Sequence, residues 1–232
     1  MNNLIPLICN RSLRSAILSF ASLLLLLSTT TARASDLQCV LISNAPLNPS
    51  IIASMMDAAN KGYLYRIEAD NSNVTFKVNH FPFSSVEGRF NEFEGGLALP
   101  EKISQAKQAL FVIKVDSITT GDNDLNDYLK SSVFFNAEQY PVIMFVSTGF
   151  VWLDNSTARL MGRLTLHGVT RPLVFDLHID TAEGNSIGNN HKITMNASAE
   201  IQRSDFGMHG LQLLVSDTVK FNLKIKAFRA SS

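Results

Sequence analysis

Apolar and polar residues alternate along most of the chain after residue 63. In the clearest run, one face carries Val219, Phe221, Leu223, Ile225 and Ala227, and the residues between them are Lys220, Asn222, Lys224 and Lys226. Residues 74–78, 173–179 and 193–201 follow the same pattern. A period of two places one face of a strand in a core and the other in water, which is typical of antiparallel sheet.

Further strands are predicted at 63–68, 87–98, 109–118, 141–153 and 157–167, which gives about eight or nine in all. Turns are predicted at Gly95-Gly96, at Asp154-Asn155 and in the link from Gly168 to Pro172. Short helices are predicted at 122–132 and 203–207. Because a closed barrel leaves no unpaired edge and can enclose one small ligand, we expect an all-β, lipocalin-like antiparallel barrel of about eight strands with one or two short helices.

The first 62 residues do not show this alternation of apolar and polar positions. Residues 1–34 have two early arginines, an apolar run at 16–27 and an Ala-Arg-Ala site, which together predict a cleaved signal peptide and export to the periplasm. An uncleaved membrane anchor is the alternative. Residues 35–62 form a leader segment with a predicted short helix at 51–60 that Gly62 would end. Residues 63–232 remain for the barrel.

Charge and cysteine content narrow the function classes. Three arginines and no acidic residue lie in 1–34, so the exported chain would have 17 basic and 20 acidic residues, a net charge of −3. A nucleic-acid partner would need a basic face and is not expected. Cys39 would remain without a second cysteine; it could pair with another molecule or carry a lipid, but Gln38 is not the small residue such lipid sites need. We favour an incidental thiol.

Catalytic and metal motifs are missing from the sequence. The five histidines show no HExxH pattern, and CxxC and GxSxG are absent. The tripeptide Asp205-Phe206-Gly207 lacks every companion signature of a kinase, so we treat it as chance. No metal, cofactor or catalytic residue is predicted.

Four stretches in order resemble the YceI family of periplasmic, lipocalin-like proteins. They are YRIEADNSNVTFKVNHFPFSSVEGRFNEF (65–93), LKSSVFFNAEQYP (129–141), GRLTLHGVTRP (162–172) and RSDFG (203–207). The resemblance covers roughly 63–229. It implies an extended barrel whose hydrophobic tunnel binds a polyisoprenoid or another long-chain amphiphile, isoprenoid quinones included, and it implies no catalytic activity.

The inward phase of the strands would form the tunnel wall. The residues expected there are Phe76, Val78, Phe111, Ile113, Phe145, Phe175, Leu177, Met195, Phe221 and Leu223. Gly162 inside a strand predicts a bulge or a close backbone approach. Arg203 and Asp205 are expected to pair near a strand end.

The ligand's head group is expected to meet Asn71, Tyr128 and Arg203. The family usually has His-Ser where this chain has Asn71-Ser72, and a basic residue, an acid and a His in the stretch that here reads Asp124 to Leu129. Amide, phenol and carboxylate groups would suit a neutral head better than a pyrophosphate, which prefers guanidinium.

The expected function is periplasmic carriage of a long isoprenoid or fatty amphiphile. An enzyme acting on such a lipid stays open. So does an interaction module whose barrel is filled by its own side chains and which partners a membrane redox protein. Transient contact with a membrane or a membrane protein, and a homodimer, are further partner hypotheses.

Overall fold

The computed structural model describes residues 49–80, 82, 84–99, 108–180 and 192–230. The expected signal peptide (1–34), Cys39 and the leader up to residue 48 lie outside the described residues. Within the described part are two α-helices, α2 (Pro49–Asn60) and α3 (Asn123–Lys130). The strands are β1 (Leu64–Ile67), β2 (Asn73–His80), β3 (Ser84–Phe90), β4 (Phe93–Ala98), β5 (Gln108–Lys114), β6 (Ile118–Thr119), β7 (Val142–Trp152), β8 (Thr157–Leu166), β9 (Val169–Asp180), β10 (Lys192–Gln202) and β11 (Val215–Arg229).

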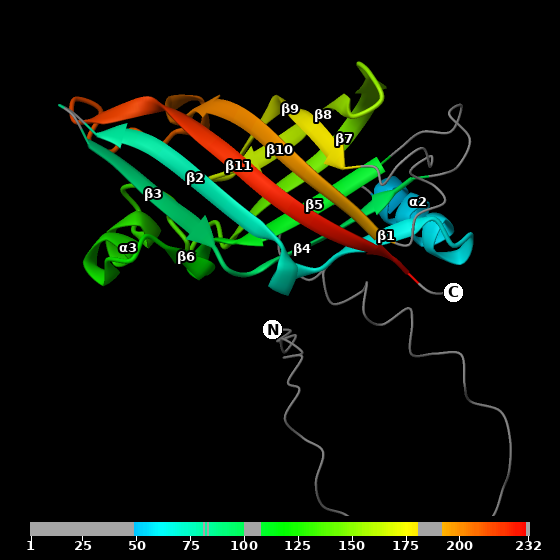
Figure 1. Cartoon of the computed structure of the whole chain (residues 1–232). Coiled ribbons are helices and arrows are strands. Elements are labelled where there is room, and N and C mark those ends of the chain that lie inside the picture. The colour runs from blue at the N-terminus through cyan, green and yellow to red at the C-terminus, as the bar shows by residue number, and fades with distance from the viewer. Residues whose placement is uncertain (1–48, 81, 83, 100–107, 181–191, 231–232) are drawn as a thin grey trace, which may run out of the picture. The chain divides into compact units, whose positions relative to one another are not determined.

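These strand segments form a closed antiparallel barrel of eight strands (Figure 1). Three of the eight are each interrupted once, so that β1 with β2, β3 with β4, and β5 with β6 act as single strands. The long β11 closes the ring, because it pairs with β10 on one side and with both β2 and β1 on the other. The predicted eight-stranded antiparallel barrel with one or two short helices is therefore confirmed.

Strand alternation follows the predicted phase. In β9, Leu173, Phe175, Leu177 and Ile179 are buried and the residues between them are exposed. In β11, Phe221 and Ala227 are buried while Lys220 is exposed. The apolar face of each strand therefore lies inside the barrel, where burial of apolar surface stabilises the fold by roughly 25 cal/mol per Å².

Two predicted turns are wrong in position. Gly95 and Gly96 lie inside β4, and the chain turns instead at Asn91 and Glu92. The glycines serve close packing, because a Cβ on Gly95 would lie 2.6 Å from the Leu110 carbonyl oxygen and one on Gly96 would lie 3.1 Å from Met55 of α2. A glycine pair therefore marks close approach here.

The link predicted from Gly168 to Pro172 is shorter than expected. The turn consists of His167 and Gly168, whose φ angles are +50° and +73°, the conformation that suits a two-residue hairpin. Pro172 lies within β9, opposite Arg163. Its missing N–H is tolerated because β9 pairs with β10 only from Asp176 to Asp180. The Asp154 turn is confirmed, since Asp154 Oδ1 accepts hydrogen bonds from the backbone of Ser156 and Thr157.

Gly162 has the role that the sequence predicts. The register of β7 against β8 shifts between Ser147 and Gly149, so β7 bulges opposite Gly162. A Cβ on Gly162 would lie 2.5 Å from the Val146 carbonyl oxygen and closer still to the ring of Phe145. The absent side chain lets the Phe145 ring lie against the β8 backbone.

The helices lie at opposite ends of the barrel (Figure 1). α2 packs on β1 and β4 and buries Met55 and Ala58; it ends at Asn60, and Gly62 follows with φ +74°. α3 packs beside β6, and its first turn is capped by Asp122, whose Oδ1 accepts from the backbone N–H groups of Asp124 and Leu125. The short helix predicted at 203–207 is a 3₁₀ turn, η5 (Arg203–Phe206). Neither described helix is long and apolar enough to cross a membrane.

Candidate functional site

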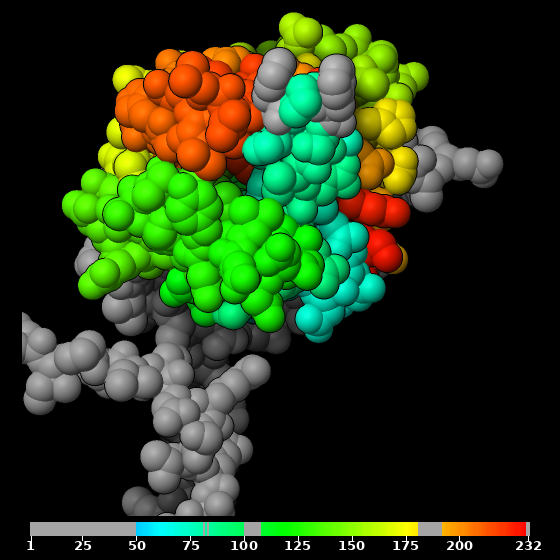
Figure 2. Space-filling model, turned by 90° about the vertical axis from the view of Figure 1, so that its left-hand side faces the viewer, coloured from blue at the N-terminus to red at the C-terminus, as the bar shows by residue number. Residues whose placement is uncertain are grey.

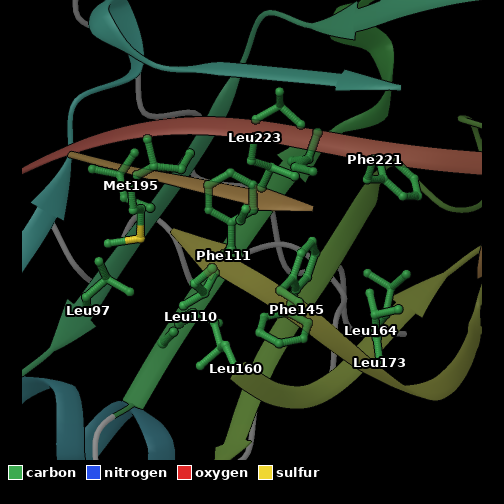
Figure 3. Close-up of a pocket in the computed structure, with 18 of the residues that line it drawn as sticks. Leu97, Leu110, Phe111, Phe145, Leu160, Leu164, Leu173, Met195, Phe221 and Leu223 are labelled. Atoms are coloured by element: carbon green, nitrogen blue, oxygen red, sulfur yellow. The ribbon is translucent and has the colours of Figure 1, made fainter. Parts of the chain in front are cut away.

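An apolar cavity lies inside the barrel (Figure 3). The centre of a water-sized sphere can move through about 70 Å³ of it. None of the nineteen described residues that line it has a nitrogen or oxygen atom in its side chain: Ile67, Val74, Leu97, Ala109, Leu110, Phe111, Ile113, Ile143, Phe145, Leu160, Leu164, Leu173, Phe175, Leu177, Met195, Ala197, Phe221, Leu223 and Ile225. Such a lining offers water no hydrogen-bond partner, so the space suits hydrocarbon.

Different side chains lie at the two ends of the cavity lining. In Figure 3, Leu97 and Met195 lie at one end of the lining, and Phe221 and Leu164 lie at the other. A second, smaller void shares Leu97 and Met195 with the first and continues from that end. Among the described residues that line the second void, Gln108 alone has a polar side chain, and its Oε1 is buried without a hydrogen-bond partner.

Aromatic rings shape the cavity wall. Phe145 and Phe175 meet edge to face, with ring centroids 5.0 Å apart, and Phe93 packs against Phe111 at 5.5 Å. The Phe145 ring takes its place because Gly162 has no side chain on the facing strand. The rings are held by packing alone, so the wall can adjust to an apolar guest without breaking a hydrogen bond.

Eight of the ten predicted wall residues line this cavity: Phe111, Ile113, Phe145, Phe175, Leu177, Met195, Phe221 and Leu223. Phe76 and Val78 are buried but do not line it, since they lie further along β2 toward the α3 end. Sequence reasoning missed Leu97, Leu110, Leu160 and Leu164, among others. The alternating pattern within β8 could have identified Leu160 and Leu164. Contact of any of these side chains with a ligand stays a prediction.

The predicted head-group residues do not meet at the cavity. Asn71 is exposed in η2 (Ala69–Asn71), where its Nδ2 donates to Glu68 Oε2 at 2.7 Å. Tyr128 lies on α3, is 39% exposed and packs edge-on against the ring of Phe134. Neither residue lines the cavity, and they lie on separate elements.

Arg203 is buried and holds a loop together. Its Nε donates to the Ser216 carbonyl, its Nη1 to the Met208 and Gly210 carbonyls, and its Nη2 to the Val215 carbonyl, at 2.6–3.1 Å. Burial lowers the pKa of the Arg203 guanidinium, and nearby Asp217 partly opposes that shift. The predicted pair with Asp205 is wrong: among the described ion pairs there is none between them. Four of the five guanidinium donors serve the fold, which argues against a head-group role.

Three of the four stretches that resemble the YceI family contact one another at the α3 end of the barrel. His167 Nδ1 lies 3.0 Å from the Phe206 carbonyl, and Arg171 Nε donates to the Asp205 carbonyl at 3.2 Å. The ring of Tyr140 contacts that of His167, with centroids 4.8 Å apart. Figure 2 shows this end, where the orange 203–215 segment, green α3 and the teal β2–β3 tip converge. We call segments 129–141, 162–172 and 203–210 the cap, which these contacts hold together.

None of the described residues that line the main cavity is titratable. Hydrogen bonds from Thr157 and Ser156 lower the pKa of Asp154 to about 2, and that residue forms a surface turn. In the described segments no three His, Cys, Asp or Glu side chains are grouped to hold a metal ion. The cavity therefore offers shape and apolar surface, and its described lining supplies no acid, base or nucleophile.

Comparison with known proteins agrees with this geometry. The family model described as YceI-like domain matches residues 65–227. A UPF0312 protein of Pectobacterium atrosepticum is 29% identical over 159 residues, which are 68% of this chain and 82% of that protein.

Two solved structures show the same fold. BcnA of Burkholderia cenocepacia superposes with a TM-score of 0.61 at 21% identity, covering 69% of this chain and 98% of that one. A domain of Saccharophagus degradans described as polyisoprenoid binding, and as implicated in plant cell wall breakdown, superposes with a TM-score of 0.54 at 19% identity. It covers 71% of this chain and 98% of that domain.

Proposed function

The chain belongs to the YceI-like domain family, and from this premise we propose that it binds a long-chain isoprenoid-type lipid inside its barrel and carries it without chemical change. The observation that supports the proposal most is the cavity whose nineteen described lining residues are all apolar. The likeness to a domain described as polyisoprenoid binding supports the same ligand class. The absence of acids, bases and nucleophiles from the described lining favours binding over catalysis.

The lipid tail should dominate the affinity. Each buried methylene contributes about 0.8 kcal/mol, so an isoprene unit contributes roughly 3–4 kcal/mol before the cost of ordering the tail is subtracted. A single hydrogen bond to the head contributes only about 0.5–1.5 kcal/mol net. Because the empty space is small, the side chains around Phe145 and Phe175 have to move apart as the tail enters.

We expect a neutral head group such as a quinone. A pyrophosphate needs cationic donors, and no Arg or Lys lies among the described residues lining the cavity. The one buried guanidinium in the described part, that of Arg203, already donates to four backbone carbonyls.

Two binding measurements test this proposal. Organic extraction of the purified protein followed by mass spectrometry should yield a long-chain compound in a stoichiometric amount. A delipidated sample should bind an isoprenoid quinone at least as tightly as the polyprenyl pyrophosphate of the same tail length. Much tighter binding of the pyrophosphate would refute the neutral head, and turnover of a bound lipid on incubation would point to an enzyme.

An interaction module is the second candidate, and the small size of the cavity favours it. With only about 70 Å³ open to a water-sized sphere, the barrel is largely filled by its own side chains. A module of this kind, docking on a membrane redox protein, would yield an empty extract and would bind no added isoprenoid. The same extraction therefore separates the two candidates.

We place this carrier in the periplasm. The proposal rests on the first 34 residues, whose apolar run and Ala-Arg-Ala site match a cleaved signal peptide. N-terminal sequencing of the protein from a periplasmic extract should begin at Ser35. Recovery of the protein with residues 1–34 intact in the membrane fraction would favour an uncleaved anchor.

A further inference from the structure

Three phenylalanine rings from separate parts of the chain lie beyond the Phe221 end of the cavity lining. Phe76 lies in β2, Phe90 in β3, and Phe135 in the segment after α3. The ring centroids of Phe76 and Phe90 are 5.7 Å apart, and those of Phe90 and Phe135 are 5.9 Å apart with an interplanar angle of 89°. All three side chains are buried. We call these three residues the aromatic floor.

The aromatic floor begins where the cavity lining ends. Phe76 pairs across the strands with Phe221, and Phe90 pairs with Val74. Phe221 and Val74 both line the cavity, whereas none of the floor residues does. Because side chains directly opposite on neighbouring antiparallel strands share a face and lie about 5 Å apart, the floor rings are the next layer beyond the lining.

The position of the Phe76 ring depends on a glycine. Gly88 faces Phe76 on β3, and a Cβ there would lie 2.5 Å from Cε1 of the Phe76 ring. The ring therefore lies flat against the β3 backbone, inside the barrel. It carries no polar atom, so shortening this side chain opens space in line with the cavity without leaving a buried hydrogen-bonding group unpaired.

We propose that the aromatic floor sets the longest lipid tail that the cavity accepts, with Phe76 as the main determinant. The inference rests on the proposed function, because it assumes that a tail enters the cavity. Each methylene that is buried raises the affinity about fourfold, and methylenes that find the space blocked add nothing. Affinity should therefore rise with tail length until the tail reaches the floor and should then stop rising.

Competition among isoprenoid alcohols of increasing length measures this limit. Delipidated protein is incubated with an equimolar mixture of these prenols, and the bound ones are extracted and quantified by mass spectrometry. Wild-type protein should show one preferred length. Phe76→Leu and Phe76→Ala should move the preference to a longer prenol, with the ratio of longer to shorter rising at least about tenfold for Phe76→Ala.

Val78→Ala is the matched control, because Val78 is buried on the same strand one step further from the cavity. It should keep the wild-type length preference. The inference is wrong if folded Phe76 variants, checked by thermal unfolding, keep the wild-type preference, or if Val78→Ala shifts it equally. If Phe76→Ala does not fold, Phe76→Leu decides by the same criterion. Failure of wild-type protein to bind any prenol would instead refute the proposed function.

Discussion

Replacement of Phe175 by Asp tests whether the apolar phase of the strands faces a hydrocarbon space. Phe175 is 8% exposed, lines the cavity and meets Phe145 edge to face. Removing a buried phenylalanine side chain typically costs about 3–5 kcal/mol. A polar group buried without a hydrogen-bond partner adds about 1–3 kcal/mol, and the described lining offers the new carboxylate no donor.

The expected loss is therefore roughly 4–8 kcal/mol, which is comparable with the ~5–15 kcal/mol by which typical domains are stable. Denaturant unfolding followed by circular dichroism measures the loss directly. Phe175→Ala should cost less than Phe175→Asp, because it leaves no buried polar group. Both variants should copurify with less lipid than the wild type.

Lys224→Gln provides the control on the outer face. Lys224 is exposed between the buried residues Leu223 and Ile225 of β11. Its replacement should change the free energy of unfolding by no more than about 0.5 kcal/mol. Similar effects of Phe175→Asp and Lys224→Gln on stability and lipid content would show that the assignment of inner and outer faces is wrong.

Three other substitutions test the bulge, the cap and the β7–β8 turn. Gly162→Ala should destabilise the protein by about 1–3 kcal/mol in denaturant unfolding, because its Cβ would meet the Val146 carbonyl and the Phe145 ring. An unchanged denaturant midpoint would contradict the close contact of the Phe145 ring with the β8 backbone. Arg203→Leu should lower the free energy of unfolding by about 3 kcal/mol, because it leaves four carbonyls without their donor, and Arg203→Lys should restore only part of that loss. A change of less than about 0.5 kcal/mol would contradict the role of Arg203 in holding the loop. The pKa of Asp154 is lowered to about 2, so its contribution to stability is present above the unfolded pKa near 4 and is lost as the pH falls toward 2. Asp154→Asn should therefore make the free energy of unfolding depend less on pH between about 4 and 2. An unchanged dependence would count against the hydrogen-bonded turn.

The architecture could be predicted from the sequence because strand alternation is a local signal. The inward faces of β9, β10 and β11 follow directly from a period of two. Their residues are buried where the pattern places them, except Val219, which is half-buried. The two errors in turn position arose because glycine and proline occur both in turns and inside strands. Gly95 and Gly96 permit close packing inside β4, and Pro172 is accommodated where β9 lacks a neighbour on one side.

Which residues line the cavity was harder to predict than the apolar nature of the lining. Phe76 has the inward phase, but its height along the barrel depends on the register between β2, β3 and β11, which no local pattern specifies. Arg203 reads as a surface charge until the loop that follows it is seen to fold around the guanidinium. Long-range register and loop closure therefore decide which of the many apolar residues surround empty space.

A structure of the protein loaded with an isoprenoid quinone would show directly whether a lipid tail enters the barrel. The tail should lie inside the barrel between Met195 and Phe221, with the rings of Phe145 and Phe175 moved apart around it. A stoichiometrically loaded protein whose ligand lies outside the barrel, with the side chains of the cavity unmoved, would contradict lipid binding in the cavity.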